Sequence, residues 1–426
     1  MQELGQAVRK TAGAIERTKT AGASKPASAE DRGRVKLGAM NESSREAAPG
    51  PESSAREFPH VMLREIYEQP QALAATIEGT VSGPTVMPAA LTPLEAELRR
   101  SARLILAASG SSRNAGLAGE IMIEELSGVA VDVEYASEYC DRSTGTTADT
   151  LVMVISQSGE TADALAALRE ARKRGAVTLG LTNAPGSALA REASAKLLTR
   201  ATREEAVPAT KSFTTQLCVL HLFALALATL KGRAGTENSG ARLAEMKRVP
   251  QLLEQSLDSW NAAAREAAQN FHRAESFLFI GRGVHYAIAR EGALKMKEIS
   301  YSPAEGLPAG ELLHGPNALV SAKSLVVAVA ACDLQDAASV GRHERTLEVL
   351  RYVKSRGGRA MVIATEGDVE AAAAADAAIF VPPLPELLLP LAEVVPLQLF
   401  AYHVGILSGS DVDHPRNLVK AVVRPK

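Results

Sequence analysis

The feature that most constrains this fold is a strand–loop–helix pattern that recurs along the chain. Short apolar runs are each followed by a loop containing Gly or Ser and then by a helix-like segment. The pattern occupies residues 102–126, 151–183, 276–299 and 325–365. Strands that alternate with helices in this way favour parallel sheets with helices on both faces. The two similar halves, each about 150 residues long, predict an α/β fold with two doubly wound parallel-sheet domains in tandem.

The segments outside this pattern set the expected domain boundaries. Residues before Phe58 are mostly small or charged, so they cannot bury enough surface to offset their ordering entropy. We expect them to be disordered, and Met40 is an alternative start. A polar stretch near residues 232–255 is interpreted as the linker between the halves. The expected parts are a disordered extension over 1–57, a first domain over 58–245, a second domain over 246–410 and a C-terminal tail over 411–426.

Short helices are expected in front of the first sheet. Residues 58–77 fit a pair of helices broken at Pro70, because proline ends or kinks a helix. Residues 89–100 fit a further connecting helix. These helices are assigned to the first domain.

The composition excludes several classes of protein. The 426 residues are 46% hydrophobic, which is enough for sizeable cores, and the net charge of -2 gives no sign of a nucleic-acid partner. Cys140, Cys218 and Cys332 are far apart, which argues against a disulfide framework and against a cysteine metal site. We therefore expect buried thiols in a reducing cytoplasm, with no metal and no cofactor.

No segment is expected to cross a membrane. The apolar run Leu217–Leu230 is only 14 residues long and contains His221, which is more typical of a core helix. The longer run Leu384–Leu407 is interrupted by three prolines. The first 40 residues lack the apolar centre of a signal peptide.

Hydroxyl side chains follow a buried strand in the stretch Val152–Thr161 (VMVISQSGET), just where a helix is predicted to begin. Such a helix start binds anions, because its first N–H groups lack partners and the helix dipole favours negative charge. Gly159 lets the backbone approach a ligand closely. The phosphate-binding candidates are Ser156, Gln157, Ser158 and Thr161. From spacing alone, an ordinary helix cap remains an equally good interpretation.

Other polar loops are expected to meet this one. In an open α/β sheet, ligands bind beyond the carboxyl ends of the strands. Ser112 and the loop 207–215, which begins at Val207, therefore converge with the hydroxyl loop on one crevice. The second half carries Ala330-Ala-Cys-Asp at the corresponding place. Only the first half is therefore expected to hold phosphate.

A second set of candidates lies in the helix predicted over residues 287–300. Glu291, Lys295 and Glu298 are spaced i, i+4 and i+7, so they share one helix face. Spacing alone favours a solvated salt-bridge ladder. Apolar neighbours on the helix weaken that interpretation, and His314 follows in a loop rich in Gly and Pro. A carboxylate, an ammonium and an imidazole together suit proton transfer next to a carbonyl.

Several long segments resemble one known family, the sugar isomerase (SIS) domains of glutamine–fructose-6-phosphate aminotransferase and of related deaminases. The resemblance covers about residues 58–426. It implies two sugar isomerase domains that bind a phosphosugar. The matching segments are MLREIYEQP (62–70), ISQSGETADAL (155–165), ATKSFTTQL (209–217), GRGVHYAIAREGALKMKEISY (281–301), AGELLHGPNALV (309–320) and VPLQLFAYHVGILSGSDVDHPRNLVKAVV (395–423).

The resemblance also implies roles for individual residues. Those implied to hold the phosphate and the sugar hydroxyls are Ser112, Ser156, Gln157, Ser158 and Thr161. Glu298 is implied to move a proton between C1 and C2 of the substrate, with support from Lys295 and Glu291. His314 is implied to assist ring opening from a neighbouring subunit, which means at least a homodimer. Lys420 is implied to bind the open-chain ketose, either as a Schiff base or without a covalent bond.

The predicted function depends on these motifs and on which residues stand near the N-terminus. Synthases of this family begin with a glutaminase domain that uses an N-terminal cysteine, whereas no cysteine precedes Cys140 here. We therefore expect first an isomerising deaminase that converts glucosamine 6-phosphate and water to fructose 6-phosphate and ammonia. The alternative is a synthase that uses free ammonia or a separate glutaminase, and the tail DVDHPRNLVKAVV favours it. A phosphosugar sensor without catalysis is a further alternative, although Glu298, His314 and Lys420 argue against it.

Overall fold

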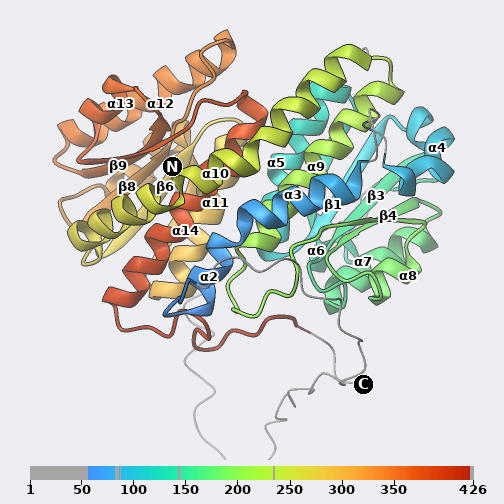
Figure 1. Ribbon diagram of the computed structural model, residues 1–426, viewed down its shortest axis with the longest axis horizontal. Helices are drawn as coiled ribbons and strands as arrows, with labels where there is room; N and C mark the ends of the chain where they lie inside the picture. Colours follow the sequence, from blue (N-terminus) through green and yellow to red (C-terminus); the bar gives the residue numbers. More distant parts are fainter. Residues whose placement is uncertain (1–55, 82–85, 87, 143–144, 234–235, 423–426) are drawn as a thin grey trace, which may run out of the picture. The chain divides into compact units, whose positions relative to one another are not determined.

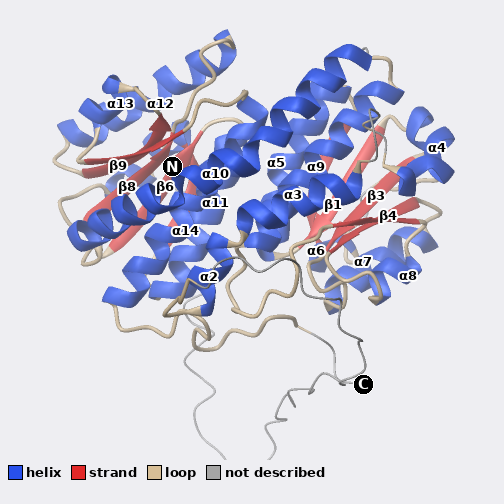
Figure 2. Ribbon diagram, in the orientation of Figure 1, coloured by secondary structure: helices blue, strands red, loops and turns tan. Residues whose placement is uncertain are grey.

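The computed structural model describes residues 56–81, 86, 88–142, 145–233 and 236–422. In this part of the chain there are two five-stranded parallel sheets, each flanked by helices (Figure 1, Figure 2). The extension expected over residues 1–57, Met40 included, lies outside the described residues apart from Arg56 and Glu57. The expected domain boundaries stay a prediction.

The first sheet is formed by strands from the first half of the chain. These are β1 (Arg103–Ala108), β2 (Ala130–Tyr135), β3 (Thr150–Ile155), β4 (Val177–Thr182) and β5 (Ala195–Leu198). All neighbours pair in parallel, in the order β2-β1-β3-β4-β5. The flanking helices are α5 (Gly110–Ser127), α6 (Ala136–Tyr139), α7 (Ala162–Lys173) and α8 (Ala188–Glu192). Every residue of β3 is buried, as expected of a strand covered on both faces.

The second sheet repeats this arrangement. Its strands are β6 (Ser276–Gly281), β7 (Ala304–Pro308), β8 (Ser324–Val329), β9 (Arg359–Thr365) and β10 (Ala377–Val381). Read from β7, the order is β7-β6-β8-β9-β10, which matches the first sheet strand for strand. The helices are α11 (Val284–Ser300), α12 (Ala337–Ser355), α13 (Val369–Ala374) and the short 3-10 turns η2 (Ala309–Leu313), η3 (Pro316–Leu319) and η4 (Glu386–Leu388). The prediction of two doubly wound sheets in tandem is confirmed.

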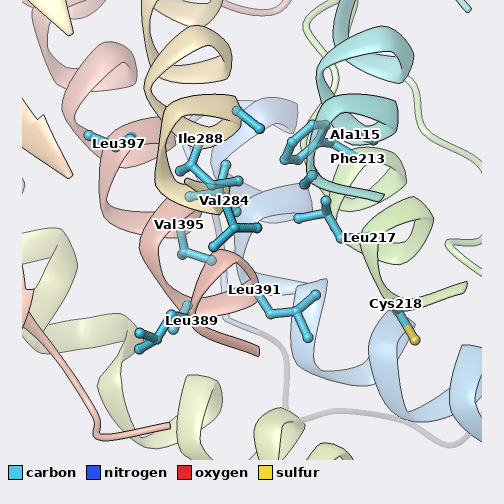
Figure 3. Packing of buried hydrophobic residues seen from close by; sticks show 14 of the residues in the cluster. Ala115, Phe213, Leu217, Cys218, Val284, Ile288, Leu389, Leu391, Val395 and Leu397 are labelled. Carbon is cyan, nitrogen blue, oxygen red and sulfur yellow. The ribbon is translucent and has the colours of Figure 1, made fainter. Parts of the chain in front are cut away.

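Long helices pack between the sheets into one hydrophobic cluster. Besides α5 and α11, these are α9 (Lys211–Leu230), α10 (Thr236–Phe271) and α14 (Leu389–Leu407). Figure 3 shows part of the cluster, with Phe213 and Leu217 of α9 on one side and Val284 and Ile288 of α11 on the other. By length and composition alone, α9 and the segment Glu386–Leu407 could cross a membrane, but 94% and 100% of their apolar windows are buried inside the fold. Both are core helices, as predicted for Leu217–Leu230. The second continues as one helix over Leu389–Leu407 with Pro396 inside it, although the prolines were expected to interrupt this run.

The polar linker predicted near residues 232–255 is wrong, because most of that stretch belongs to α10. Apolar residues recur there every three or four positions, and this period places them on one buried face of a helix. The polar residues between them occupy the solvent face, which made the stretch look like a linker. The buried series is Leu243, Met246, Val249, Leu253, Leu257 and Trp260.

The leading helices are close to those predicted. They are α2 (Val61–Tyr67) and α3 (Gln69–Thr80), followed by the 3-10 turn η1 (Ala89–Leu94) and by α4 (Glu95–Arg100). The break between α2 and α3 falls before Gln69 rather than at Pro70, because Pro70 occupies the first turn of α3. Proline is tolerated there, since the N–H groups of that turn have no intrahelical partner.

The start of α2 is capped from the far end of the chain. Neither His60 at its N-cap nor its own first turn provides an acidic cap. The carboxylate of Asp413 accepts the backbone N–H groups of Val61 at 3.0 Å and Met62 at 2.7 Å. The carbonyl of Asp413 also accepts the N–H of Val207 at 2.9 Å. Asp413 therefore ties the tail to the leading helices and to the loop at Val207.

Replacing Asp413 by Ala should lower the free energy of unfolding by about 1 kcal/mol, the usual cost of losing a helix cap. Urea unfolding followed by circular dichroism measures this change. Asp413→Asn retains an acceptor oxygen and should lie between the wild type and the Ala variant. Equal unfolding midpoints for Asp413→Ala and the wild type would show that the cap contributes nothing.

Candidate active site

One cavity of about 310 Å³ lies beyond the carboxyl ends of β1 and β3, where the strand order of the first sheet reverses. This is where a doubly wound sheet binds its ligand. All candidates from the sequence line it except Glu291 and His314. The predicted residues at the cavity are Ser112, Ser156, Gln157, Ser158, Thr161, Val207, Lys295, Glu298 and Lys420. The first domain, α11 of the second domain and the tail therefore contribute to the same cavity.

The hydroxyl loop after β3 does not act as an ordinary helix cap. Thr161 is the N-cap residue of α7, yet its side chain makes no capping hydrogen bond. Its hydroxyl lies 3.0 Å from that of Ser156, and Ser156 Oγ accepts the N–H of Gly159 at 3.1 Å. Ser158 and Thr161 both line the cavity in front of α7. This geometry favours anion binding by hydroxyl groups and by the start of the helix.

Gly159 is required here for a reason that the sequence did not show. Its φ is +64°, and a Cβ at this position would lie 2.1 Å from the hydroxyl oxygen of Ser187. Ser187 Oγ in turn caps α8 by accepting the N–H of Ala190 at 3.3 Å. The close approach is therefore to the neighbouring loop, and it fixes the shape of the hydroxyl loop.

Gln216 is a cavity residue that the sequence analysis missed. It lies one turn after Ser212 on α9, and both residues line the cavity. Its Nε2 donates to Ser112 Oγ at 3.1 Å, while its Oε1 is buried and has no hydrogen-bond partner among the described residues. Two polar residues four positions apart in a strongly apolar helix were the available signal.

Lys295 lies between two carboxylates in the interior. It is 1% exposed, its Nζ lies 3.5 Å from Glu291 Oε1, and it donates to Glu298 Oε2. Glu291 is fully buried and accepts hydrogen bonds from Ser111 Oγ at 2.7 Å and Asn114 Nδ2 at 2.9 Å, both on α5. The solvated ladder suggested by spacing is therefore wrong. Glu291 does not line the cavity, but it contacts the Lys295 ammonium within the interior.

The charge of Lys295 is stabilised by its neighbours. Burial lowers the pKa of Lys295, but the carboxylates of Glu298 and Glu291 outweigh burial and raise that pKa above its ordinary value. Burial likewise raises the pKa of Glu291. Lys295 therefore remains an ammonium at neutral pH. Glu298, with a side chain 22% exposed at the cavity, is the carboxylate that a substrate can reach.

Lys420 reaches the cavity from the tail and is held there by Glu204, which the sequence analysis also missed. Lys420 Nζ donates to Glu204 Oε2 at 2.5 Å and to the carbonyl of Ala206 at 2.7 Å. Glu204 further accepts the N–H groups of Thr210 and Ser212 and the hydroxyl of Ser212. Burial raises the pKa of Glu204, but the Lys420 ammonium and these hydrogen bonds outweigh burial and hold the pKa below its usual range.

His314 is not part of the cavity of its own chain. It follows η2, is exposed, and does not line the cavity. Within the described part of one chain, the structure therefore leaves this candidate apart from the other catalytic candidates.

The corresponding edge of the second sheet is unsuited to phosphate. His285, at the start of α11, is buried and hydrogen-bonds Glu386 at 3.1 Å and Glu393 at 2.9 Å. Burial lowers the pKa of His285, but these two carboxylates raise it to about 10. Glu386 also accepts from Ser339 and from Arg342. Carboxylates already pair with the positive groups here, which supports the prediction that only the first domain holds phosphate.

Known proteins share this architecture. The model of the SIS domain matches residues 97–226 and 270–408. The glutamine–fructose-6-phosphate aminotransferase [isomerizing] of a Thermus thermophilus strain is 42% identical over 368 residues, which cover 86% of this chain and 59% of that protein. Its counterpart in Chlorobaculum tepidum is 41% identical over 369 residues, covering 86% and 58%. The chain thus spans less than two thirds of the aminotransferases that it matches.

Solved structures agree with the sequence matches. The C-terminal domain of glucosamine-fructose-6-phosphate aminotransferase from Francisella tularensis has a TM-score of 0.79 and 35% identity, covering 85% of this chain and 100% of that chain. A glucosamine-6-phosphate deaminase from Thermotoga maritima, 23% identical with a TM-score of 0.65, shares the fold. The chain therefore belongs to the SIS domain family, together with the C-terminal domain of the aminotransferase.

Proposed function

We propose that this chain forms glucosamine 6-phosphate from fructose 6-phosphate and ammonia, and that it also catalyses the reverse deamination. The observation that carries the proposal is the single cavity where the hydroxyl loop, Lys295, Glu298 and Lys420 meet. The aminotransferases that are 42% and 41% identical favour synthesis as the main direction. This reverses the order expected from the sequence, which put deamination first.

In this proposal the phosphate of the substrate binds at the hydroxyl loop and the carbon chain extends toward α11. Ammonia adds to the C2 carbonyl of the open-chain ketose, and water leaves. Glu298 then carries a proton from C1 to C2, and the hydroxyl proton on O1 is transferred to the nitrogen, which leaves an aldehyde at C1 and an amine at C2. The reaction balances as fructose 6-phosphate plus ammonia giving glucosamine 6-phosphate plus water. Lys295 stabilises the negative charge that develops while the proton is in transit.

Lys420 acts without a covalent bond in this proposal. An ammonium has no free electron pair, so it cannot attack a carbonyl carbon. Lys420 Nζ already donates to Glu204 Oε2 and to the carbonyl of Ala206, and these contacts hold it as a hydrogen-bond donor. The sequence left a Schiff base and a non-covalent role open, and this pairing supports the second. Lys420 would then stabilise a developing oxyanion on the substrate.

Replacing Ser158 and Thr161 by Ala removes two hydroxyl donors to a charged phosphate. Each such hydrogen bond contributes about 1.5–3 kcal/mol, so the Michaelis constant for the phosphosugar should rise tenfold or more while the fold survives. Steady-state kinetics with fructose 6-phosphate measure the change. Ser355→Ala, at an exposed position away from the cavity, is the matched control. An unchanged Michaelis constant in the double variant would remove this loop from the site.

His314 is proposed to act in the cavity of a second copy, because it is exposed and does not line its own cavity. Chains with His314→Ala and chains with Glu298→Gln should each be inactive. After mixing and subunit exchange, about a quarter of wild-type activity should return, because each mixed dimer then has one cavity with both residues intact. No recovery in exchanged dimers, verified by mass spectrometry, would contradict a contribution from the second copy.

The proposed function is tested directly with the purified full chain. Fructose 6-phosphate and ammonium chloride should give glucosamine 6-phosphate, and glucosamine 6-phosphate alone should release ammonia. Initial rates in each direction, measured without product and over a range of ammonium concentrations, tell which direction the chain runs faster. Synthesis slower than deamination at every ammonium concentration would restore the deaminase interpretation. No conversion in either direction, with the phosphosugar still bound, would favour a sensor.

A further inference from the structure

A patch of two arginines and two tyrosines lies where α5 and α11 pack together, and the proposed reaction does not use it. We call it the arginine–tyrosine patch: Arg113, Tyr135, Tyr286 and Arg290. The Arg113 guanidinium stacks on the Tyr135 ring, with its carbon 3.8 Å from the ring centre. Arg290 Nη1 donates to the Tyr286 hydroxyl at 3.0 Å. Tyr135 is 45% exposed, so the patch is open to solvent.

The two arginines have no ion-paired carboxylate among the described residues, although the Glu120 carboxylate acts on Arg113 at longer range. Within the described residues, neither Arg113 nor Arg290 forms an ion pair, although most arginines of this chain with comparable burial do. The Nε of Arg113 is buried and has no hydrogen-bond partner there. Burial lowers the pKa of Arg113, and the nearby positive charge of Arg290 lowers it further. Two guanidinium groups close enough for one to lower the pKa of the other are therefore held together without an ion pair among the described residues.

The patch is close to the active-site cavity but separate from it. None of its four residues lines the cavity. Asn114 connects the patch to the group around Lys295. Its Oδ1 is 3.5 Å from Arg290 Nε, and its Nδ2 donates to Glu291 Oε2 at 2.9 Å. Glu291 faces Lys295 on its other side. The patch is therefore linked to Lys295 through Asn114 and Glu291, and its own residues stay outside the cavity lining.

We propose that the arginine–tyrosine patch binds a phosphate monoester or inorganic phosphate at a second site on this chain. Two guanidinium groups carry two positive charges, which a phosphate dianion neutralises. Their planar N–H forks match phosphate oxygens, and the tyrosine hydroxyls add further donors. The hydroxyl loop, which is proposed to bind the substrate phosphate, contains no Arg or Lys, although Lys295 and Lys420 line the same cavity. The two sites therefore use different residues and can be removed separately.

Counting bound inorganic phosphate tests this proposal independently of activity. Equilibrium dialysis with labelled phosphate at low ionic strength is applied to the full chain and to three variants. Ser158→Ala/Thr161→Ala should keep the patch site, and Arg113→Gln/Arg290→Gln should keep the loop site. The variant with all four changes should bind at least tenfold more weakly than either. Arg273→Gln, at an exposed arginine without an ion pair among the described residues, is the control for loss of one positive charge elsewhere on the surface and should bind like the wild type.

Each result bears on the proposal. Phosphate binding to Ser158→Ala/Thr161→Ala that disappears on adding Arg113→Gln and Arg290→Gln supports the patch, even if the proposed reaction fails. Phosphate binding at the patch that is lost in Arg113→Gln/Arg290→Gln but present in Arg113→Lys/Arg290→Lys would show that the positive charges hold the phosphate, which also supports the proposal. If Arg113→Gln/Arg290→Gln binds as many phosphate ions, with the same affinity, as the wild type, the proposed phosphate site at the patch is overturned. If phosphate binding is unchanged in Arg113→Gln/Arg290→Gln but its sedimentation coefficient shifts, the patch is a contact between two copies of the chain and the phosphate site is overturned.

Discussion

Glu298→Gln is expected to lower turnover by about 10²–10⁴-fold, the usual loss when general acid–base catalysis is removed. The substitution keeps the shape of the side chain but cannot accept the C1 proton. Glu298 is the only carboxylate of the Lys295 group that lines the cavity within the described residues. Substrate binding should survive, because the proposed phosphate contacts come from the hydroxyl loop and not from Glu298.

Exchange of the substrate's C1 or C2 proton with solvent deuterium, followed by NMR, measures this step directly. In Glu298→Gln the exchange should stop, while the Michaelis or dissociation constant for the phosphosugar changes little. Glu344→Gln replaces an exposed carboxylate on α12 and should behave like the wild type. Normal exchange in Glu298→Gln would mean that another group moves the proton.

The fold could be predicted from the sequence because its pattern is local. Continuous apolar runs such as β3, followed by a loop and an amphipathic helix, indicate a parallel strand whatever its neighbours are. The strand order and the path of α10 depend on tertiary packing. The segment near residues 232–255 has a polar surface, so its buried face was recognised only in the structure. The cap of α2 by Asp413 spans more than 350 residues and leaves no local signal.

Part of the site could also be predicted, because some of its residues follow a local sequence pattern. The hydroxyl loop has a local explanation, because a strand end and a helix start are visible in the sequence. Glu291 and Lys295 were identified, but their burial was not, because it depends on α5 packing against α11. Glu204 was missed because its partner Lys420 is 216 residues away. Residues that act through a distant partner carry no periodic signal.

The pairing of Glu204 with Lys420 also has a consequence for stability. The pKa of Glu204 is lower in the folded chain than in the unfolded chain. The pair therefore stabilises the fold at neutral pH, and this contribution is lost as the pH falls through the lowered pKa of Glu204. Removing Lys420 leaves Glu204 as an unpaired carboxylate with a buried side chain, whereas removing Glu204 leaves Lys420, whose side chain is 26% exposed. The loss of stability should therefore approach roughly 3–5 kcal/mol, the cost of breaking a buried pair, in Lys420→Met and stay below it in Glu204→Gln.

Lys420→Met is expected to lower turnover by about 10²–10³-fold, the usual loss when one preorganised donor to a developing oxyanion is removed. A chain truncated after Asn417 should show the same loss and still fold, because Asp413 remains to cap α2 and to hold the loop at Val207. Glu204→Gln replaces the ion pair with Lys420 by a neutral hydrogen bond, so its turnover should fall less than that of Lys420→Met.

The double variant Glu204→Gln/Lys420→Met separates structure from catalysis. It contains no unpaired charge, so its unfolding midpoint should return toward that of the wild type, while turnover stays as low as in Lys420→Met. Borohydride reduction with fructose 6-phosphate should leave the mass of Lys420 unchanged, because Lys420 is proposed to act as a hydrogen-bond donor held by Glu204. A trapped adduct on Lys420 would replace the non-covalent role with a covalent one. Wild-type turnover in Lys420→Met or in the truncated chain would show that the tail lines the cavity without taking part in the reaction.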